Sequence, residues 1–241
     1  MDIKSALFVC LTACIVFGLC FILIRSKGAS VYSVIVKALA SFSFVLCFVV
    51  SIIYDTEFDS AVIGLAMGLV AGLIGDILLE LKVVYSDDSD DYLNAGFISF
   101  GVGHFFYIYA MITLAGGRWA VNNLWLYIGI AALIAGAMTA GSYFMMKKLL
   151  KYDFGKHTVI TFVYSFILFF STVFAVCLSF GNSSFASIAI GLILFCLSDL
   201  ILSMQYFGGQ QNNNVFQVLN HTSYYLAQIV IASTLFISML V

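Results

Sequence analysis

The stretch AVIGLAMGLVAGLIGDILLEL, residues 61–81, is long enough and apolar enough to cross a membrane as a helix. Such a helix needs about 20 mainly apolar residues. The rest of the 241-residue chain has the same character, because 63% of its residues are hydrophobic and only 9% are charged. Soluble domains are about 45–50% apolar and about 25% charged. The sequence therefore predicts an integral membrane protein and excludes an ordinary soluble domain.

Several further apolar stretches of this kind follow one another along the chain. Their runs are continuous, which excludes a β-barrel, whose strands alternate apolar and polar residues. We therefore expect an all-α fold, a polytopic transmembrane bundle of about eight helices, with residues 1–241 forming a single integral membrane domain. The predicted spans are 6–24, 32–53, 61–81, 95–115, 123–146, 158–180, 185–205 and 219–240.

Two aspartates, Asp76 and Asp199, lie inside these apolar spans in similar local sequence. Each follows a small residue and precedes three aliphatic residues. An ionisable side chain inside a span costs about 2.5–3.5 kcal/mol on insertion scales, so it indicates a functional site. The two positions are 199 − 76 = 123 residues apart, about half the chain. The chain could therefore consist of two parallel four-helix repeats, with halves 1–118 and 119–241.

Basic residues are concentrated in the first and fifth predicted loops, whereas Arg118 is the only one in the fourth. Cytoplasmic loops of membrane proteins carry an excess of Lys and Arg. We therefore expect the odd-numbered loops to face the cytoplasm and both termini to lie on the other side. The basic residues of the first and fifth loops are Arg25, Lys27, Lys147, Lys148, Lys151 and Lys156.

The polar residues inside the spans gather toward this same membrane face. Successive spans run in opposite directions, so the position of a residue along its span indicates the face to which it is nearer. Asp76 lies about five residues from the end of its predicted span, or roughly 7–8 Å, which is near the depth of a phospholipid's glycerol backbone. The other polar candidates on this face are Lys37, His104, Tyr107, Tyr164, Tyr224, Tyr225 and Gln228.

The spacing of small residues predicts where Asp76 points. Gly64, Gly68 and Gly72 are four residues apart, and the next step of four is Asp76. Small residues at this spacing let helices approach closely. We therefore expect Asp76 to face the interior of the bundle.

Other polar residues have simpler interpretations. Glu80 lies one turn after Asp76 and is interpreted as reaching the membrane interface, and His157 as an ordinary loop residue. The acidic cluster at 87–91 is interpreted as a solvated loop, because it lacks the spacing of a calcium-binding loop. We expect no metal site, no cofactor and no nucleic-acid partner, since neither ligand spacing nor a basic stripe is present.

Several short motifs follow one another over nearly the whole chain. They are Gly75-Asp76-Ile77-Leu78-Leu79, Gly103-His104-Phe105-Phe106-Tyr107, Leu197-Ser198-Asp199-Leu200 and Thr222-Ser223-Tyr224-Tyr225-Leu226-Ala227-Gln228. In this order they resemble the lysoplasmalogenase family of eight-span membrane proteins, also called the YhhN-like family. Lys37 and Val163-Tyr164 also fit the family pattern, although Ala38 stands where the family often has proline.

The resemblance implies hydrolysis of the vinyl ether bond of a lysophospholipid substrate within membrane lipid, without a cofactor. This chemistry needs one protonated carboxyl and one carboxylate, and burial beside a second acid favours keeping one of the two protonated. The hypothesis is that Asp76 and Asp199 are the catalytic pair, in either assignment. His104, Tyr225 and Gln228 would position water or the carboxylates, and the phosphate would meet Lys37 together with Tyr164.

Two alternatives from other functional classes remain. In a proton-coupled transporter, the two aspartates would carry protons through a pseudo-symmetric bundle. In a non-catalytic lipid-binding membrane protein, the same residues would bind a lipid without turnover. The one-sided placement of the polar residues favours a lipid enzyme over a transporter. Head-group preference and oligomeric state are not encoded in any pattern that we recognise.

Overall fold

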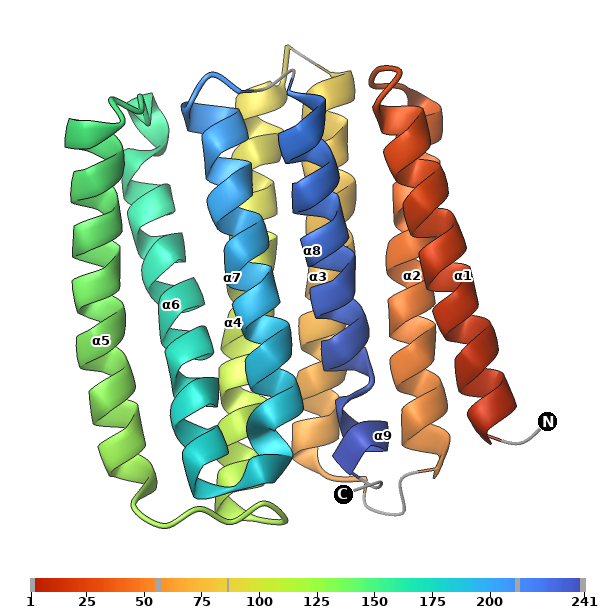
Figure 1. Ribbon diagram of the computed structural model, residues 1–241, viewed down its shortest axis with the longest axis vertical. Coiled ribbons are helices and arrows are strands. Elements are labelled where there is room, and N and C mark those ends of the chain that lie inside the picture. The colour runs from red at the N-terminus through yellow and green to blue at the C-terminus, as the bar shows by residue number, and fades with distance from the viewer. Residues whose placement is uncertain (1–2, 55–57, 86, 211–212, 239–241) are drawn as a thin grey trace.

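The computed structural model describes residues 3–54, 58–85, 87–210 and 213–238, and these are mostly helical with no strand. Figure 1 shows long helices running roughly parallel to one another. The α-helices are α1 (Ile3–Arg25), α2 (Val31–Tyr54), α3 (Ser60–Val84), α4 (Ser89–Gly116), α5 (Leu124–Phe144), α6 (Thr158–Gly181), α7 (Ala186–Phe207), α8 (Asn214–Ala232) and α9 (Thr234–Ser238).

The predicted all-α membrane bundle is confirmed. Seven helices, α1 to α7, are long and apolar enough to cross a membrane, and each contains one predicted span or nearly all of it. The eighth predicted span, 219–240, corresponds to α8 and the short α9, and its residues 239–240 lie outside the described residues. Helix α8 is less apolar than the others because Asn220, His221 and Gln228 are buried on its inner face.

Two helix ends differ from the predicted boundaries. Helix α4 begins at Ser89 rather than 95, so Asp90 and Asp91 lie in its first turn, where the helix dipole favours negative charge. Helix α3 continues to Val84 rather than ending at 81, which places Asp76 eight residues from its end. The depth of Asp76 is therefore about 12 Å along the helix instead of 7–8 Å.

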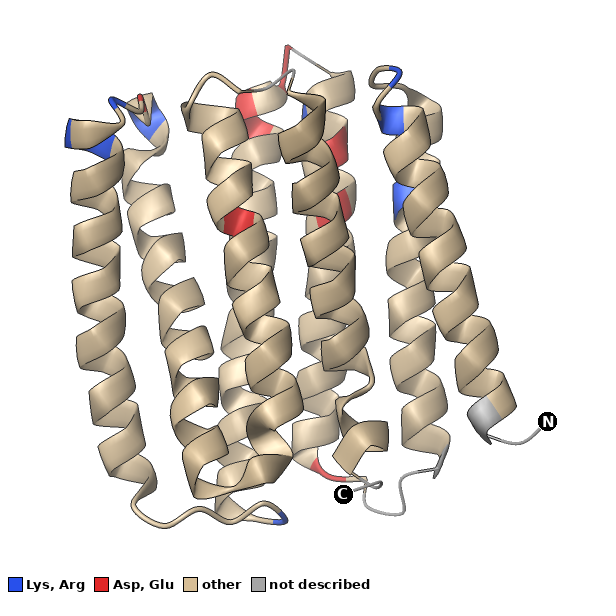
Figure 2. Ribbon diagram, viewed as in Figure 1, with Lys and Arg blue, Asp and Glu red and all other residues tan. Residues whose placement is uncertain are grey.

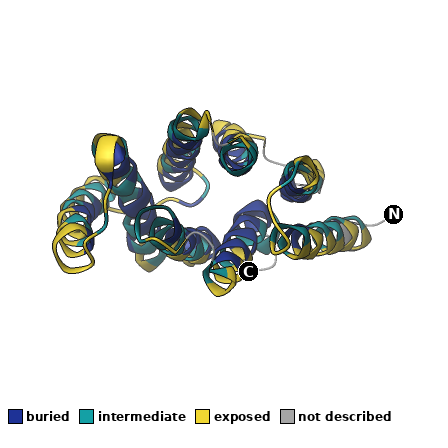
Figure 3. Ribbon diagram, turned by 90° about the horizontal axis from the view of Figure 1, so that it is seen from above, coloured by how far each residue is buried: buried dark blue, intermediate teal, exposed yellow. Residues whose placement is uncertain are grey.

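The helices pack in pairs around the centre of the bundle. In Figures 1 and 3, α3 and α4 form one side, and α7 and α8 lie opposite them. Helix α2 contacts both α3 and α8, and α6 contacts both α4 and α7. Each main contact between two of the first four helices therefore has a counterpart four helices later: α1–α2 corresponds to α5–α6, α2–α3 to α6–α7, and α3–α4 to α7–α8. This arrangement fits two parallel repeats, while the boundaries of the halves remain a prediction.

Close packing of α3 against its neighbours depends on its glycines, as predicted. A Cβ atom at Gly64 would lie 3.0 Å from Ala110 Cβ on α4, and one at Gly68 would overlap the Tyr107 ring. A Cβ atom at Gly72 would lie 2.9 Å from Gln228 Nε2 on α8. These glycines therefore face the interior, and the same helix face carries Asp76, which is 2% exposed.

Gly68→Ala should lower the thermal stability of the protein, because the new methyl group displaces the buried Tyr107 ring. Overpacking of this kind costs about 1–3 kcal/mol. Gly136→Ala in α5 is the matched control, since the added Cβ would have no described atom within 4 Å apart from its chain neighbours and the nearby backbone of its own helix. The control should be neutral or stabilising by up to about 1 kcal/mol. Thermal unfolding in detergent measures both, and equal midpoints for the two variants would contradict the packing argument.

Candidate functional site

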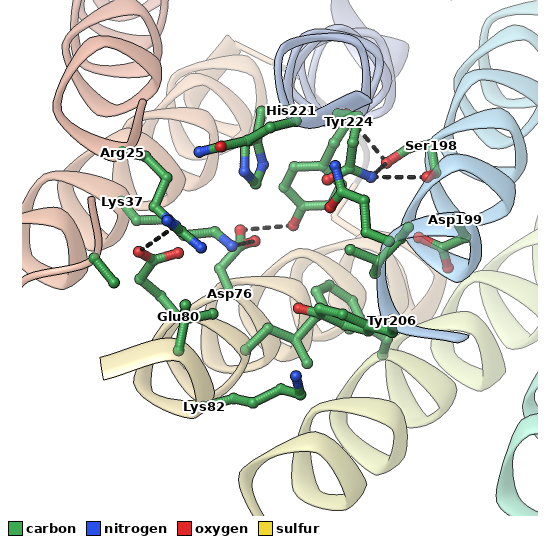
Figure 4. A pocket seen from close by; sticks show the side chains of 18 of the residues that line it. Arg25, Lys37, Asp76, Glu80, Lys82, Ser198, Asp199, Tyr206, His221 and Tyr224 are labelled. Atoms are coloured by element: carbon green, nitrogen blue, oxygen red, sulfur yellow. Dashed lines mark hydrogen bonds and ion pairs between the residues drawn. The ribbon is translucent and has the colours of Figure 1, made fainter. Parts of the chain in front are cut away.

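A polar cavity of about 340 Å³ lies between α1, α2, α3, α7 and α8, toward the end of the bundle that carries the odd-numbered loops (Figure 4). Figure 2 shows most described basic residues gathered at this same end. The cavity reaches from the α1–α2 loop at Gly28 inward to Asp76. Its charged lining residues are Arg25, Lys37, Asp76, Glu80, Lys82 and Asp199.

Asp76 is held by three donors from two other helices. Its Oδ2 accepts hydrogen bonds from Ser41 Oγ at 2.5 Å and from the Tyr224 hydroxyl at 2.7 Å. Its Oδ1 lies 3.4 Å from the ammonium of Lys37, and both side chains are almost fully buried. Hydrogen bonds and a cation directed at a carboxylate favour its ionised form. The surroundings of Asp76 therefore suit a carboxylate.

The Tyr224 hydroxyl, which donates to Asp76, is itself held by hydrogen bonds to other side chains. Gln228 Nε2 donates to the Tyr224 hydroxyl at 2.9 Å, and the Tyr107 hydroxyl donates to Gln228 Oε1 at 3.4 Å. The predicted candidates Tyr107, Tyr224 and Gln228 thus form one hydrogen-bonded chain that ends on Asp76. A side chain locked in this way holds the carboxylate in a single orientation.

Asp199 has a different environment from that of Asp76. The Tyr164 hydroxyl donates a short hydrogen bond to its Oδ2. No Lys or Arg nitrogen among the described residues lies within 4.0 Å of it. Ser41 precedes Asp76 by 35 residues, and Tyr164 precedes Asp199 by the same number. The position equivalent to Lys37 in the second half is Ile160, so the second carboxyl has no counterpart of that lysine at this position.

An apolar cavity of about 50 Å³ lies beside the polar one and shares part of its wall. Asp199 lines both cavities, together with Leu79, Phe100, Leu202 and Tyr206. Leu168 and Phe169 of α6 form part of the apolar side. A polar and an apolar compartment therefore meet at one carboxyl group.

Glu80, interpreted from sequence as reaching the membrane interface, is buried at the rim of the polar cavity. This residue is 2% exposed and does not reach the interface. Its Oε1 accepts a hydrogen bond from Ser33 Oγ at 2.6 Å and lies 3.2 Å from Arg25 Nε. Lys82, two residues further along α3, has its ammonium 4.1 Å from the centre of the Tyr206 ring. The buried negative charge of Glu80 is thus compensated by Arg25 on α1 and Ser33 on α2.

Four predicted site residues line neither cavity: Tyr107 and Gln228, which belong to the hydrogen-bonded chain below Asp76, and His104 and Tyr225. His104 is fully buried and its Nδ1 is 2.9 Å from Ser171 Oγ, which links α4 to α6. Tyr225 is buried against Phe21, with ring centroids 6.3 Å apart. Their assignment to water or carboxylate positioning stays a prediction. The structure places both residues behind the groups that face the cavities.

His157, interpreted from sequence as an ordinary loop residue, is buried and connects two helices. Its Nδ1 lies 2.8 Å from Asn94 Oδ1, and its Nε2 lies 2.8 Å from Asp90 Oδ1. The acidic cluster is therefore not wholly solvated, because Asp90 also pairs with Lys156 at 2.7 Å. These contacts hold the start of α6 against the start of α4.

Comparison with known proteins identifies one family. The model of the YhhN family matches residues 32–235, a range that contains every site residue predicted from the sequence. The match confirms the resemblance drawn from the sequence motifs. No curated protein and no solved structure matches the chain.

Proposed function

Since the chain belongs to the YhhN family, we propose that it hydrolyses the vinyl ether bond of lysoplasmalogens. The products would be a fatty aldehyde and glycerophosphocholine or glycerophosphoethanolamine. The observation that carries this proposal is the position of Asp199 at the junction of a polar and an apolar cavity. In a lysoplasmalogen, the vinyl ether lies at the junction of the polar glycerophosphate and the hydrocarbon chain.

The different surroundings of the two carboxyls support a division of roles. Asp76 accepts two hydroxyl hydrogen bonds and faces Lys37, which favours the carboxylate and suits a general base. Asp199 has a hydroxyl partner, no Lys or Arg nitrogen of the described residues lies within 4.0 Å of it, and part of its surroundings is apolar. Burial without a cation favours the neutral acid. We therefore assign Asp199 as the acid and Asp76 as the base.

The reaction follows from these roles. Asp199 gives its proton to the β-carbon of the vinyl ether, and the adjacent carbon becomes an oxocarbenium ion. Asp76 removes a proton from water as the water oxygen bonds to that carbon, which yields a hemiacetal. The hemiacetal then collapses: its hydroxyl group loses a proton and becomes the aldehyde carbonyl, its carbon–oxygen bond to glycerol breaks, and the glycerol oxygen takes up a proton in place of the one lost. One water is consumed, and the two carboxyls return to their starting protonation states after one proton is exchanged between them.

The remaining site residues fit supporting roles in this scheme. Lys37 lies against Asp76, so we assign it to stabilising the carboxylate rather than to phosphate binding. Tyr164 orients Asp199, and the chain from Tyr107 through Gln228 to Tyr224 orients Asp76. A preorganised carboxylate needs little rearrangement in the transition state.

We further propose that the cavity opens toward the cytoplasm. Most described basic residues lie at the cavity end of the bundle (Figure 2), whereas Arg118 pairs with Asp59 at the start of α3, which is the opposite end. The positive-inside rule supports a cytoplasmic position for the basic end. Substrate would then reach the site from the cytoplasmic leaflet.

The test is aldehyde release by purified protein in detergent or nanodiscs. Lysoplasmalogen should yield fatty aldehyde, whereas the saturated 1-O-alkyl analogue, which has no vinyl carbon to protonate, should yield none. In D₂O the aldehyde, trapped by reduction, should carry one deuterium at carbon 2, which reports protonation of the β-carbon. Absence of aldehyde with folded protein would exclude the hydrolase and leave the lipid-binding and transporter alternatives.

A further inference from the structure

Three cations line the polar cavity, and two of them form ion pairs inside it with described carboxylates. Arg25 pairs with Glu80, and Lys37 pairs with Asp76. No described carboxylate lies within 4.0 Å of the Lys82 ammonium, which instead stands over the ring of Tyr206. In Figure 4 the charged ends of Arg25 and Lys82 point toward the cavity from different sides.

We propose that Lys82, assisted by Arg25, binds the phosphodiester of the lysophospholipid. This proposal rests on the proposed function for the identity of the lipid, and on the cavity itself for the anion site. A guanidinium has five N–H donors, so the Nε contact of Arg25 to Glu80 leaves donors for a second acceptor. Cations with available donors form the strong charge-assisted hydrogen bonds that bind phosphate oxygens.

The charge balance of the cavity supports an anionic ligand. Arg25, Lys37 and Lys82 contribute three positive charges, and the ionised forms of Asp76 and Glu80 contribute two negative charges. With Asp199 protonated as the acid, one positive charge remains uncompensated. That charge is assigned to Lys82, because Arg25 and Lys37 are ion-paired inside the cavity. The acidic neighbour of Lys82, Asp90, does not line this cavity and pairs with Lys156. A bound phosphodiester would make the occupied cavity neutral.

The position along α3 also fits. Lys82 lies six residues after Asp76, about 9 Å nearer the end of the helix. In a lysoplasmalogen, the three-carbon glycerol separates the phosphate from the vinyl ether oxygen. The phosphate must therefore lie beyond the carboxylates, toward the membrane surface. Lys82 also borders a second polar cavity of about 350 Å³ at that surface, so a headgroup extending past the phosphate has room.

The decisive variant is Lys82→Met, which keeps the unbranched stem over Tyr206 and removes the charge. Its KM for lysoplasmalogen should rise about 10- to 100-fold with kcat changed less than about threefold, as expected for one charge-assisted contact made in both ground and transition states. Lys82→Arg should recover most of the affinity. Turnover of 1-alkenylglycerol, which has no phosphate, should be the same in Lys82→Met and wild type.

The matched control is Lys148→Met. The Lys148 ammonium also stands over an aromatic ring, Phe144, at 4.8 Å, at the same end of the bundle but outside the cavity. This variant should behave as wild type with both substrates. An equal loss on lysoplasmalogen and 1-alkenylglycerol in Lys82→Met would overturn the phosphate assignment, because it would report damage to the site as a whole.

A binding measurement separates this proposal from the hydrolase proposal. The probe is radiolabelled 1-O-alkyl-lysophosphocholine, which carries the phosphate but no vinyl ether. Wild type should bind it about 10- to 100-fold more tightly than Lys82→Met. This difference without aldehyde release would overturn the hydrolase and support the anion site. Turnover with equal binding in both proteins, or inorganic phosphate binding as tightly as the lysolipid, would overturn the lipid phosphate site.

Discussion

Asp199→Asn should lower the kcat for lysoplasmalogen by about 10²- to 10⁴-fold, the usual contribution of a positioned general acid. The amide has nearly the shape of the carboxyl group, and its oxygen can still accept the hydrogen bond from Tyr164. It has no proton of suitable acidity to give to the β-carbon. We therefore expect the variant to fold normally and to bind substrate, but to form the oxocarbenium ion very slowly.

The measurement is aldehyde release at saturating substrate, together with binding of the 1-O-alkyl analogue and gel filtration. Asp91→Asn is the control, because Asp91 is exposed at the start of α4 and lines neither cavity. It should retain wild-type turnover. A folded Asp199→Asn protein with near-normal kcat would rule out this residue as the acid.

The sequence predicted the parts of the site that apolar surroundings make conspicuous. Asp76 and Asp199 stand out because a carboxyl inside an apolar span is costly and therefore rare. The glycines before Asp76 indicated its inward direction, and the structure confirms this. Both inferences depend only on residue type and helical spacing, which are properties of the chain read locally.

The residues that sequence reasoning missed depend on contacts between helices. Ser41 is one of several serines in α2, and only the packing of α2 on α3 shows that it binds Asp76. Arg25 marks the end of a span in the sequence, yet it turns inward to a buried Glu80. Lys82 sits where a lysine normally extends to the interface. One sequence signal does indicate Ser41: it precedes Asp76 by 35 residues, as Tyr164 precedes Asp199, so it occupies the equivalent position in the first half.

The fold was likewise predictable in outline but not in every boundary. Continuous apolar runs predicted the long helices, since a membrane requires all backbone hydrogen bonds to be satisfied within each span. The start of α4 was missed because its acidic first turn has the composition of a loop. The end of α8 at Ala232 was missed because no proline or glycine marks it.

Asp76→Asn should abolish turnover and also destabilise the protein, a combination that distinguishes Asp76 from Asp199. The substitution removes the proposed base, and it leaves the buried ammonium of Lys37 without the carboxylate that it faces in the described structure. Removing one member of a buried ion pair costs about 3–5 kcal/mol, because the other charge remains desolvated. The ring of Phe21, 5.4 Å from the ammonium, offers only weak compensation.

The double variant Lys37→Met/Asp76→Asn tests this reasoning. Removing both charges should restore most of the thermal stability, since a neutral pair of similar volume replaces the unpaired cation. Turnover should stay at the level of Asp76→Asn, because no base has been returned. Lys37→Met alone should also be destabilised, since a buried carboxylate then lacks its cation.

Thermal unfolding midpoints of the two single variants and the double variant form a double-mutant cycle. A coupling close to zero would show that the two side chains do not stabilise one another, and the assignment of Asp76 as a fixed carboxylate would fail. Recovery of both stability and turnover in the double variant would exclude Asp76 as the base. The expected result, stability without turnover, would assign Lys37 to holding the charge of Asp76 and Asp76 itself to the chemistry.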